Sequence, residues 1–292
     1  PILTLFKLQL WLAGTVALLA PITYLAPNIF GNLTWILNSV TDGNFGIASI
    51  AAQFFVAILL IMVPTTLLGA SFPVAVKTYI NNFDFRARGT GYVYAFNTLG
   101  AVIGSFVGGF VLLPNFGTRL SLIIIGLLFF ASAFILLKLI RKIENYNIFL
   151  KFHKILPITF FLTSLVIILI IPNKTVVNYN MQKNSTPNVI YHNDGVSHTI
   201  DIVKSDEGNI VMMVNGNIEA DTTYIQRRHF ILKAHLPVLL HGEANEVAVV
   251  GLGLGITLKS ILDNPLVKNV KLIELSPEMI KAHQLNPKIS NN

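Results

Sequence analysis

Cysteine is absent from the 292 residues of this chain, and charged side chains make up only 12% of it. Without thiols, the chain can form neither a disulfide nor a thiolate-bound metal site. The seven histidines do not recur at the spacing of metal ligands, so no metal is expected. Apolar residues are abundant instead: their share of 53% exceeds that of ordinary soluble domains. The composition therefore predicts a protein that contacts lipid.

The net charge of +7 comes entirely from the first part of the chain. Residues 1–172 hold ten Lys and Arg against three Asp and Glu, whereas residues 173–292 hold eleven of each kind. The basic excess lies between apolar segments, where it orients a protein in the bilayer. We therefore expect the lipid bilayer as a partner and no nucleic acid.

Five apolar segments are long enough to cross a bilayer, which takes about 20 residues. They cover residues 8–26, 46–68, 89–113, 120–140 and 155–171. Basic loops near residue 80 and over 141–154 would lie in the cytoplasm by the positive-inside rule. Five full crossings would put the rest of the chain on the opposite face, unless one segment is re-entrant. Because long domains obey the charge rule weakly, we expect a multi-pass protein of a bacterial inner membrane with a cytoplasmic C-terminal part.

The third segment carries small residues at every fourth position, at Gly100, Gly104 and Gly108. These glycines share one helix face, which predicts close packing of another helix there. Asn97 in the same segment predicts a hydrogen bond to a neighbouring helix or a polar site.

Alternating glycines follow a short apolar run near the end of the chain. Residues 247–250 predict a buried strand, 256–262 a helix, and 270–273 a second strand that ends on Glu274. Strand, glycine turn, helix, strand and acid outline a nucleotide-binding βαβ unit.

Each part of this unit suits a nucleoside. Glycine allows φ > 0 and a close approach of backbone N–H groups, and the acid can accept hydrogen bonds from both ribose hydroxyls. A dinucleotide fingerprint would need a glycine where the chain has Ile256. Alternating glycines are typical of S-adenosyl nucleoside sites, although a glycine-rich turn without a ligand stays open. The predicted nucleoside-binding residues are Gly251, Gly253, Gly255 and Glu274.

The second half divides into three parts by composition. Residues 173–188 form a polar linker, and residues 189–220 predict a small β-hairpin domain from their alternation and turn signals. The strands predicted there cover residues 199–204 and 210–214. Residues 221–292 predict the start of a Rossmann-like α/β domain, truncated after its second strand. The predicted fold class is a multi-pass α-helical membrane domain over 1–172, followed by the small β-domain and the Rossmann-like domain.

Two groups of motifs stand out within residues 67–285. The first holds LLGASFPVAVKTY and GYVYAFNTLGAVIGSFVGGFVLLPNFG, and the second holds NGNIEADTTY, HLPVLLHG, VAVVGLGLGIT and VKLIELSP. Together they resemble the membrane-anchored relatives of spermidine synthase, the polyamine aminopropyltransferases. The resemblance implies a small β-domain ahead of a Rossmann-like domain. It also implies decarboxylated S-adenosylmethionine as donor, a small amine as acceptor and methylthioadenosine as product, and a homodimer is kept as a possibility.

The chain departs from the family pattern on the acceptor side. Soluble members carry an Asp-Glu pair where this chain has Ile225 and Gln226, and a Gln where it has Ile200. That acidic pair meets the cationic polyamine, so the acceptor amine is left open. The catalytic Asp of the family would lie beyond Asn292. The catalytic residue is therefore unknown, and we expect a fragment that is inactive on its own.

These features together predict a membrane-bound aminopropyltransferase-like enzyme. An S-adenosylmethionine-dependent methyltransferase shares the glycine turn and the acid, and is the first alternative. A membrane transporter or sensor whose nucleotide domain only binds is the second.

Overall fold

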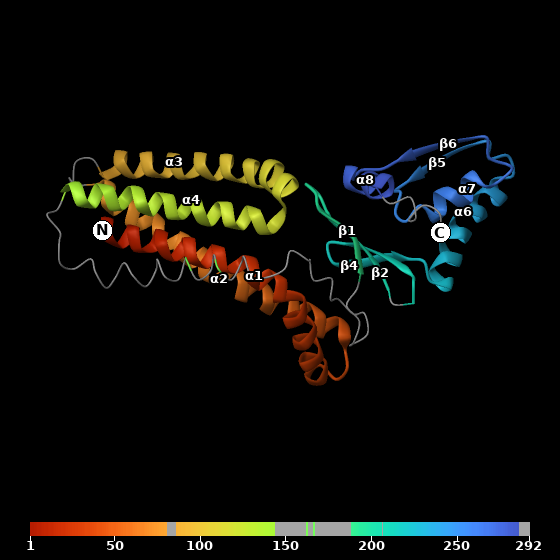
Figure 1. Cartoon of the computed structure of the whole chain (residues 1–292), viewed down its shortest axis with the longest axis horizontal. Coiled ribbons are helices and arrows are strands. Elements are labelled where there is room, and N and C mark those ends of the chain that lie inside the picture. Colours follow the sequence, from red (N-terminus) through yellow and green to blue (C-terminus); the bar gives the residue numbers. More distant parts are fainter. Residues whose placement is uncertain (81–85, 144–161, 163–165, 167–187, 206, 286–292) are drawn as a thin grey trace. The chain divides into compact units, whose positions relative to one another are not determined.

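The computed structural model describes most of the chain, in two compact units: Pro1–Val176 and Val177–Asn292. The described residues are 1–80, 86–143, 162, 166, 188–205 and 207–285. The first unit is helical, and the second combines strands and helices (Figure 1). Each unit is described by itself below.

Long helices build the first unit. They are α1 (Ile2–Val40), α2 (Phe45–Tyr79), α3 (Arg86–Val107) and α4 (Leu113–Ile143), with a π-helical turn η2 (Gly108–Leu112) between the last two. A tight turn joins α1 to α2, because Asp42 and Gly43 both have positive φ. Asn44 then caps α2 by accepting a hydrogen bond from the Ile47 N–H at 3.2 Å.

Helices α1 and α4 pack closely because small residues meet at their interface. A Cβ on Gly126 of α4 would lie 3.3 Å from the Ala13 carbonyl oxygen of α1, so the two backbones nearly touch. Phe6 and Leu10 of α1 are buried against Ala133 and Ile140 of α4. The same interface holds a polar contact, in which the Ser132 hydroxyl donates to Gln9 Oε1 at 2.9 Å.

The glycine stripe on α3 does not have the predicted role in the described residues. A Cβ added to Gly100, Gly104 or Gly108 would meet nothing within 4 Å, so no described helix approaches this face. Asn97 is likewise exposed. The prediction of close packing there is wrong for the described residues; the close approach occurs at Gly126 instead.

The chain reverses its direction between α3 and α4 (Figure 1). Pro114 has no N–H to continue an α-helical ladder, and the Leu113 N–H bonds to Gly108 O across a wider π-turn. Further along, Gly117 has φ 69° and ψ 174°, far from helical values. The apolar run is therefore divided near these residues.

Three described stretches are long and apolar enough to cross a membrane: Ile2–Leu19, Phe45–Tyr79 and Ala87–Ile140. The first two correspond to the first two predicted segments. The predicted segments 89–113 and 120–140 both fall within the third stretch, which has 54 residues. The two predicted segments form one stretch because the helical hydrogen bonding between them is almost continuous, although the backbone at Gly117 is not helical. The predicted segment 155–171 lies outside the described residues, apart from residues 162 and 166.

An antiparallel meander opens the second unit. Strands β1 (Asn188–Asp194), β2 (Thr199–Lys204), β3 (Ile210–Val214) and β4 (Asn217–Asp221) pair in chain order. The predicted strands 199–204 and 210–214 coincide with β2 and β3. Strand β4 was not predicted, because it begins in the turn signal around Asn215 and Gly216 and exposes most of its side chains.

A βαβ unit follows the meander. Helix α6 (Tyr224–His241) leads into strand β5 (Glu246–Val250), helix α7 (Ile256–Leu262), strand β6 (Asn269–Ile273) and helix α8 (Pro277–Leu285). Strands β5 and β6 are parallel, so a crossover helix must join them. Ala234 of α6 and Ile261 of α7 are buried against Val249 of β5.

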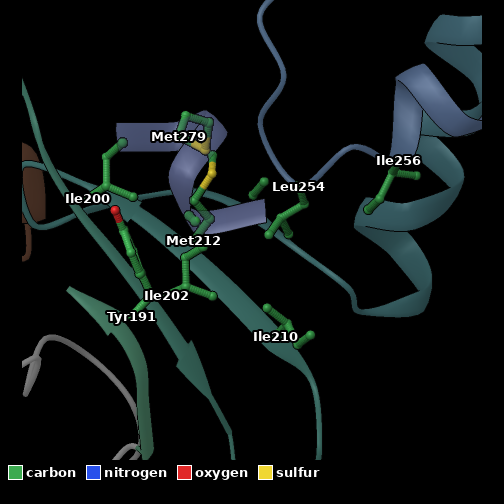
Figure 2. Packing of buried hydrophobic residues seen from close by; sticks show 10 residues of the cluster. Tyr191, Ile200, Ile202, Ile210, Met212, Leu254, Ile256 and Met279 are labelled. Carbon is green, nitrogen blue, oxygen red and sulfur yellow. The ribbon is translucent and has the colours of Figure 1, made fainter. Parts of the chain in front are cut away.

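The meander and the βαβ unit share one hydrophobic core, shown in Figure 2. Ile200, Ile202 and Met212 of the sheet are buried in it together with Leu254 of the glycine turn and Met279 of α8. Burial of large aliphatic side chains stabilises a fold by about 1.5–3 kcal/mol each. The core therefore fixes α8 and the glycine turn against the sheet.

Candidate functional site

The glycine turn between β5 and α7 uses backbone conformations that favour glycine. Gly251, Gly253 and Gly255 have φ of 88°, 53° and 76°. The N–H of Gly251 donates to Ile273 O at 2.8 Å, and that of Gly255 donates to Leu252 O at 2.9 Å. The three predicted glycines thus shape the turn.

Two backbone N–H groups of the turn have no hydrogen-bond acceptor among the described residues. Those of Gly253 and Leu254 donate to no other described residue. Leu254 anchors its side chain in the shared core, so this part of the turn is held in place while its N–H groups have no partner among the described residues. Such groups suit a carboxylate, a hydroxyl or a ring nitrogen of a nucleoside.

Glu274 follows β6 directly and lies against the turn, as the sequence predicts. Its Oε2 accepts the Leu252 N–H at 2.6 Å, and its Oε1 accepts the Ser276 N–H at 2.8 Å. An ionised carboxylate has about four lone-pair positions, so two acceptor positions remain. Glu274 therefore ties the glycine turn to the loop after β6 and can still receive ribose hydroxyls.

A histidine that the sequence did not single out also contacts the turn. His283 of α8 places its Nε2 2.7 Å from Gly253 O. A carbonyl oxygen only accepts, so Nε2 is the donor. The two residues are 30 positions apart, and no motif marks His283. The only available signal was its place on the core-facing side of the predicted helix, four residues after the buried Met279.

The loop after Glu274 leads into α8, whose first turn contacts the meander. The Ser276 hydroxyl donates to Glu278 Oε2 at 2.9 Å, and the Tyr191 hydroxyl of β1 donates to the Glu278 carbonyl oxygen at 3.1 Å. A Cβ on Gly195, after β1, would lie only 2.6 Å from Glu278 Cδ. The β1–β2 hairpin is therefore pressed against the first turn of α8.

A second polar cluster lies on β1 and β2. His192 Nδ1 is 2.7 Å from Asp201 Oδ1, and His192 Nε2 is 3.7 Å from Asp194 Oδ1. Asp194 also accepts the Thr199 hydroxyl at 2.8 Å. The hydrogen bond to Asp201 raises the pKa of His192, burial opposes the rise, and the charges of both aspartates add to it. The imidazolium form thus stabilises the hairpin.

The residues at the predicted acceptor side are apolar or exposed. Ile225 lies in the first turn of α6 with 80% of its surface exposed, and its neighbour Gln226 is exposed too. Ile200 is buried in the shared core and offers no polar group. Within the described ranges, no group of three or more His, Asp or Glu side chains is arranged to hold a metal ion.

The first unit has helices apolar enough to cross a membrane, and the second unit has a glycine turn with an acid beside it. Comparison with known proteins adds to these two observations. The chain is 25% identical over 222 residues to polyamine aminopropyltransferase 2 of Aquifex aeolicus (strain VF5), covering 76% of this chain and 42% of that protein. It is 26% identical over 94 residues to polyamine aminopropyltransferase 1 of the same organism, covering 32% of this chain and 33% of that protein. No protein-family model matches the chain.

These similarities support a distant, spermidine synthase-like relationship to the polyamine aminopropyltransferases. The chain spans less than half the length of the relatives it matches. Both relatives are transferases by name.

Proposed function

We propose that this chain belongs to a membrane-bound aminopropyltransferase-like enzyme whose βαβ unit begins a Rossmann-like domain. The donor would be decarboxylated S-adenosylmethionine. The observation that carries the proposal is the contact between the Glu274 carboxylate and the Leu252 N–H of the glycine turn. This contact puts an acid and backbone N–H groups that lack a described partner at the carboxyl ends of β5 and β6, which is where open α/β sheets bind nucleotides.

The donor would bind through its nucleoside part. Glu274 would accept the ribose hydroxyls with its two remaining acceptor positions, while the N–H groups of Gly253 and Leu254 would contact another polar group of the donor. An amine nitrogen then attacks the aminopropyl carbon next to the sulfonium. The new N–C bond forms as the C–S bond breaks, its electron pair goes to sulfur, and methylthioadenosine leaves as a neutral product. The amine proton passes to a base, and alignment of the two reactants supplies much of the acceleration.

The acceptor amine would be recognised differently from the polyamine of the soluble relatives. Ile225 and Gln226 provide no carboxylate for a second ammonium group. This observation favours an acceptor of lower charge. It also keeps an S-adenosylmethionine-dependent methyltransferase as a second candidate, because that reaction uses the same turn and acid.

The membrane half would cross the bilayer several times. Separate passages of α1, α2, α3 and α4 place the α2–α3 connection and the end of α4 on one face. Both places carry basic residues, which favours the cytoplasmic face for them. The second unit shares that face only if the predicted segment 155–171 enters and leaves the membrane on the same side. A cytosolic donor could then reach the glycine turn.

The test compares two donors with the intact protein in detergent. Decarboxylated S-adenosylmethionine and S-adenosylmethionine, each labelled, are incubated with putrescine and with a panel of monoamines. Release of methylthioadenosine from the first donor supports aminopropyl transfer. Release of S-adenosylhomocysteine from the second would establish the methyltransferase instead, and turnover of neither donor would contradict both.

A further inference from the structure

His283 contacts the glycine turn at two points. Its Nε2 donates to Gly253 O at 2.7 Å, and its Cε1 lies 3.2 Å from the position of a Cβ on Gly255. One ring thus holds one glycine by a hydrogen bond and occupies the space beside the next. A side chain at position 255 would contact this ring closely, so the ring can keep its position only while residue 255 is glycine.

The bond to Gly253 fixes the plane of one peptide group. A trans peptide is planar, so its C=O and the following N–H point in opposite directions. The described chain has no cis peptide. When His283 holds the Gly253 carbonyl toward α8, the Leu254 N–H points away from α8. That N–H is one of the two in the turn that donate to no described residue.

The histidine itself is held firmly by the fold. Its neighbours on α8, Met279 and Ala282, are 5% and 0% exposed and pack in the same core as Leu254 and Ile256. The backbone on both sides of the 2.7 Å contact is therefore anchored. A donor on a packed helix can orient a turn more exactly than one on a loop.

We propose that His283 is a positioning residue for the nucleoside site: it sets the Gly253–Leu254 peptide so that the Leu254 N–H faces the ligand. The proposal rests on the nucleoside-binding function proposed above. It assigns the residue no chemical step.

Three substitutions separate the hydrogen bond from simple packing. In H283Q the amide Nε2 lies as many bonds from Cβ as the ring Nε2 and can reach Gly253 O. In H283N the amide is one bond shorter and cannot reach. H283L fills space without a donor. Glutamine and asparagine form the matched pair, because they carry the same group at two lengths.

The first measurement is amide hydrogen exchange of a peptide covering residues 251–258, with a peptide from β2 and β3 as internal reference. We expect faster exchange in H283N and H283L, wild-type exchange in H283Q, and an unchanged reference peptide. Equal exchange in the glutamine and asparagine variants would overturn the proposal. This result does not depend on which ligand the site takes.

The second measurement is the affinity for methylthioadenosine by calorimetry. Loss of the bond leaves a carbonyl unpaired and the peptide free to turn, so we expect about tenfold weaker binding in H283N and H283L. H283Q should stay within about threefold of the wild type. Faster exchange with unchanged affinity in H283N would overturn the positioning role. Absence of binding in the wild type would instead contradict the proposed function, and the exchange result would still decide whether His283 holds the turn.

Discussion

At the scale of single residues, Glu274 fixes the shape of the turn. Both of its oxygens accept backbone N–H groups, from Leu252 and Ser276. A carboxylate is suited to this because it only accepts, and bonds to a charged acceptor contribute about 1.5–3 kcal/mol. The acid therefore orients the turn before any nucleoside arrives.

E274Q should weaken methylthioadenosine binding by about ten- to a hundredfold. The amide retains one acceptor oxygen, so its NH₂ group faces either the Leu252 or the Ser276 N–H, and the charge-assisted contact with ribose is lost. Isothermal titration of the intact protein measures the change. E243Q, at an exposed position before β5, is the matched control and should bind as the wild type does. Equal affinity in both variants would remove Glu274 from the site.

His192 makes the stability of the second unit depend on pH. Its pKa is raised in the fold, chiefly by the hydrogen bond to Asp201, with the charges of Asp201 and Asp194 adding to the effect against burial. A raised pKa means that protonation favours the folded state. The contribution is fully present below the ordinary value of 6.5 and is lost as the pH rises through the raised pKa.

H192Q should therefore lower the melting temperature most below pH 6.5, and the difference from the wild type should shrink as the pH rises above neutrality. Thermal unfolding followed by circular dichroism at several pH values tests this. H229Q, at an exposed histidine of α6 outside this cluster, is the matched control. A difference that grows with pH would contradict the assigned direction.

The residues of the candidate site differ in how far the sequence could place them. The three glycines were predicted because alternating glycines after an apolar strand imply positive φ, and all three have it. Glu274 was placed because it ends the second strand. His283 was missed because its contact depends on how α8 packs against the core, which no local pattern encodes.

At the scale of elements, the β1–β2 hairpin and α8 form one contact region around Gly195 and Glu278. The Tyr191 hydroxyl reaches the Glu278 carbonyl, and the Glu278 carboxylate occupies the space beside Gly195. The loop that carries Ser276 runs directly from there to Glu274. A shift of the hairpin would consequently reach Glu274 and, through it, the glycine turn.

G195A should destabilise the second unit by about 0.5–1.5 kcal/mol, the usual contribution of one hydrogen bond, because the flexible Glu278 side chain must move aside. The new Cβ would lie 2.6 Å from Glu278 Cδ, and moving that carboxylate breaks its bond with Ser276. A double-mutant cycle with E278A checks the cause. Removing the carboxylate should abolish most of the cost of G195A. Additive effects of the two changes would show that the contact is not the reason.

Element boundaries followed local pattern where the pattern was strong. Strands β2 and β3 were predicted to the residue, because their apolar runs are flanked by turn signals. Strand β4 was missed, because Asn217, Glu219 and Asp221 give it the composition of a loop. It is held by a tight hairpin with β3, in which Val214 pairs with Asn217 across the turn at Asn215 and Gly216, so the strand depends on its partner and not on its own composition.

At the scale of the whole molecule, apolar composition separates the two units. The helices of the first unit expose many large side chains, including Phe54, Phe96 and Phe106. In water such surfaces would be unfavourable, whereas in a bilayer they face lipid. The number of candidate membrane-spanning stretches was harder to predict than their presence, because hydropathy finds apolar length but does not show how Pro114 and Gly117 divide a 54-residue stretch.

The topology can be tested cleanly because the chain has no cysteine. Single cysteines introduced by S39C and S197C become the only thiols, and both replace exposed serines with a side chain of similar size. Ser39 lies near the α1–α2 turn, which our proposal places outside the cytoplasm. Ser197 lies between β1 and β2, which the proposal places in the cytoplasm with the donor. In bacterial spheroplasts, a membrane-impermeant maleimide should label S39C directly and S197C only after lysis. Labelling of S197C in sealed spheroplasts would put the glycine turn on the face opposite the donor, and aminopropyl transfer from a cytosolic donor would then be ruled out.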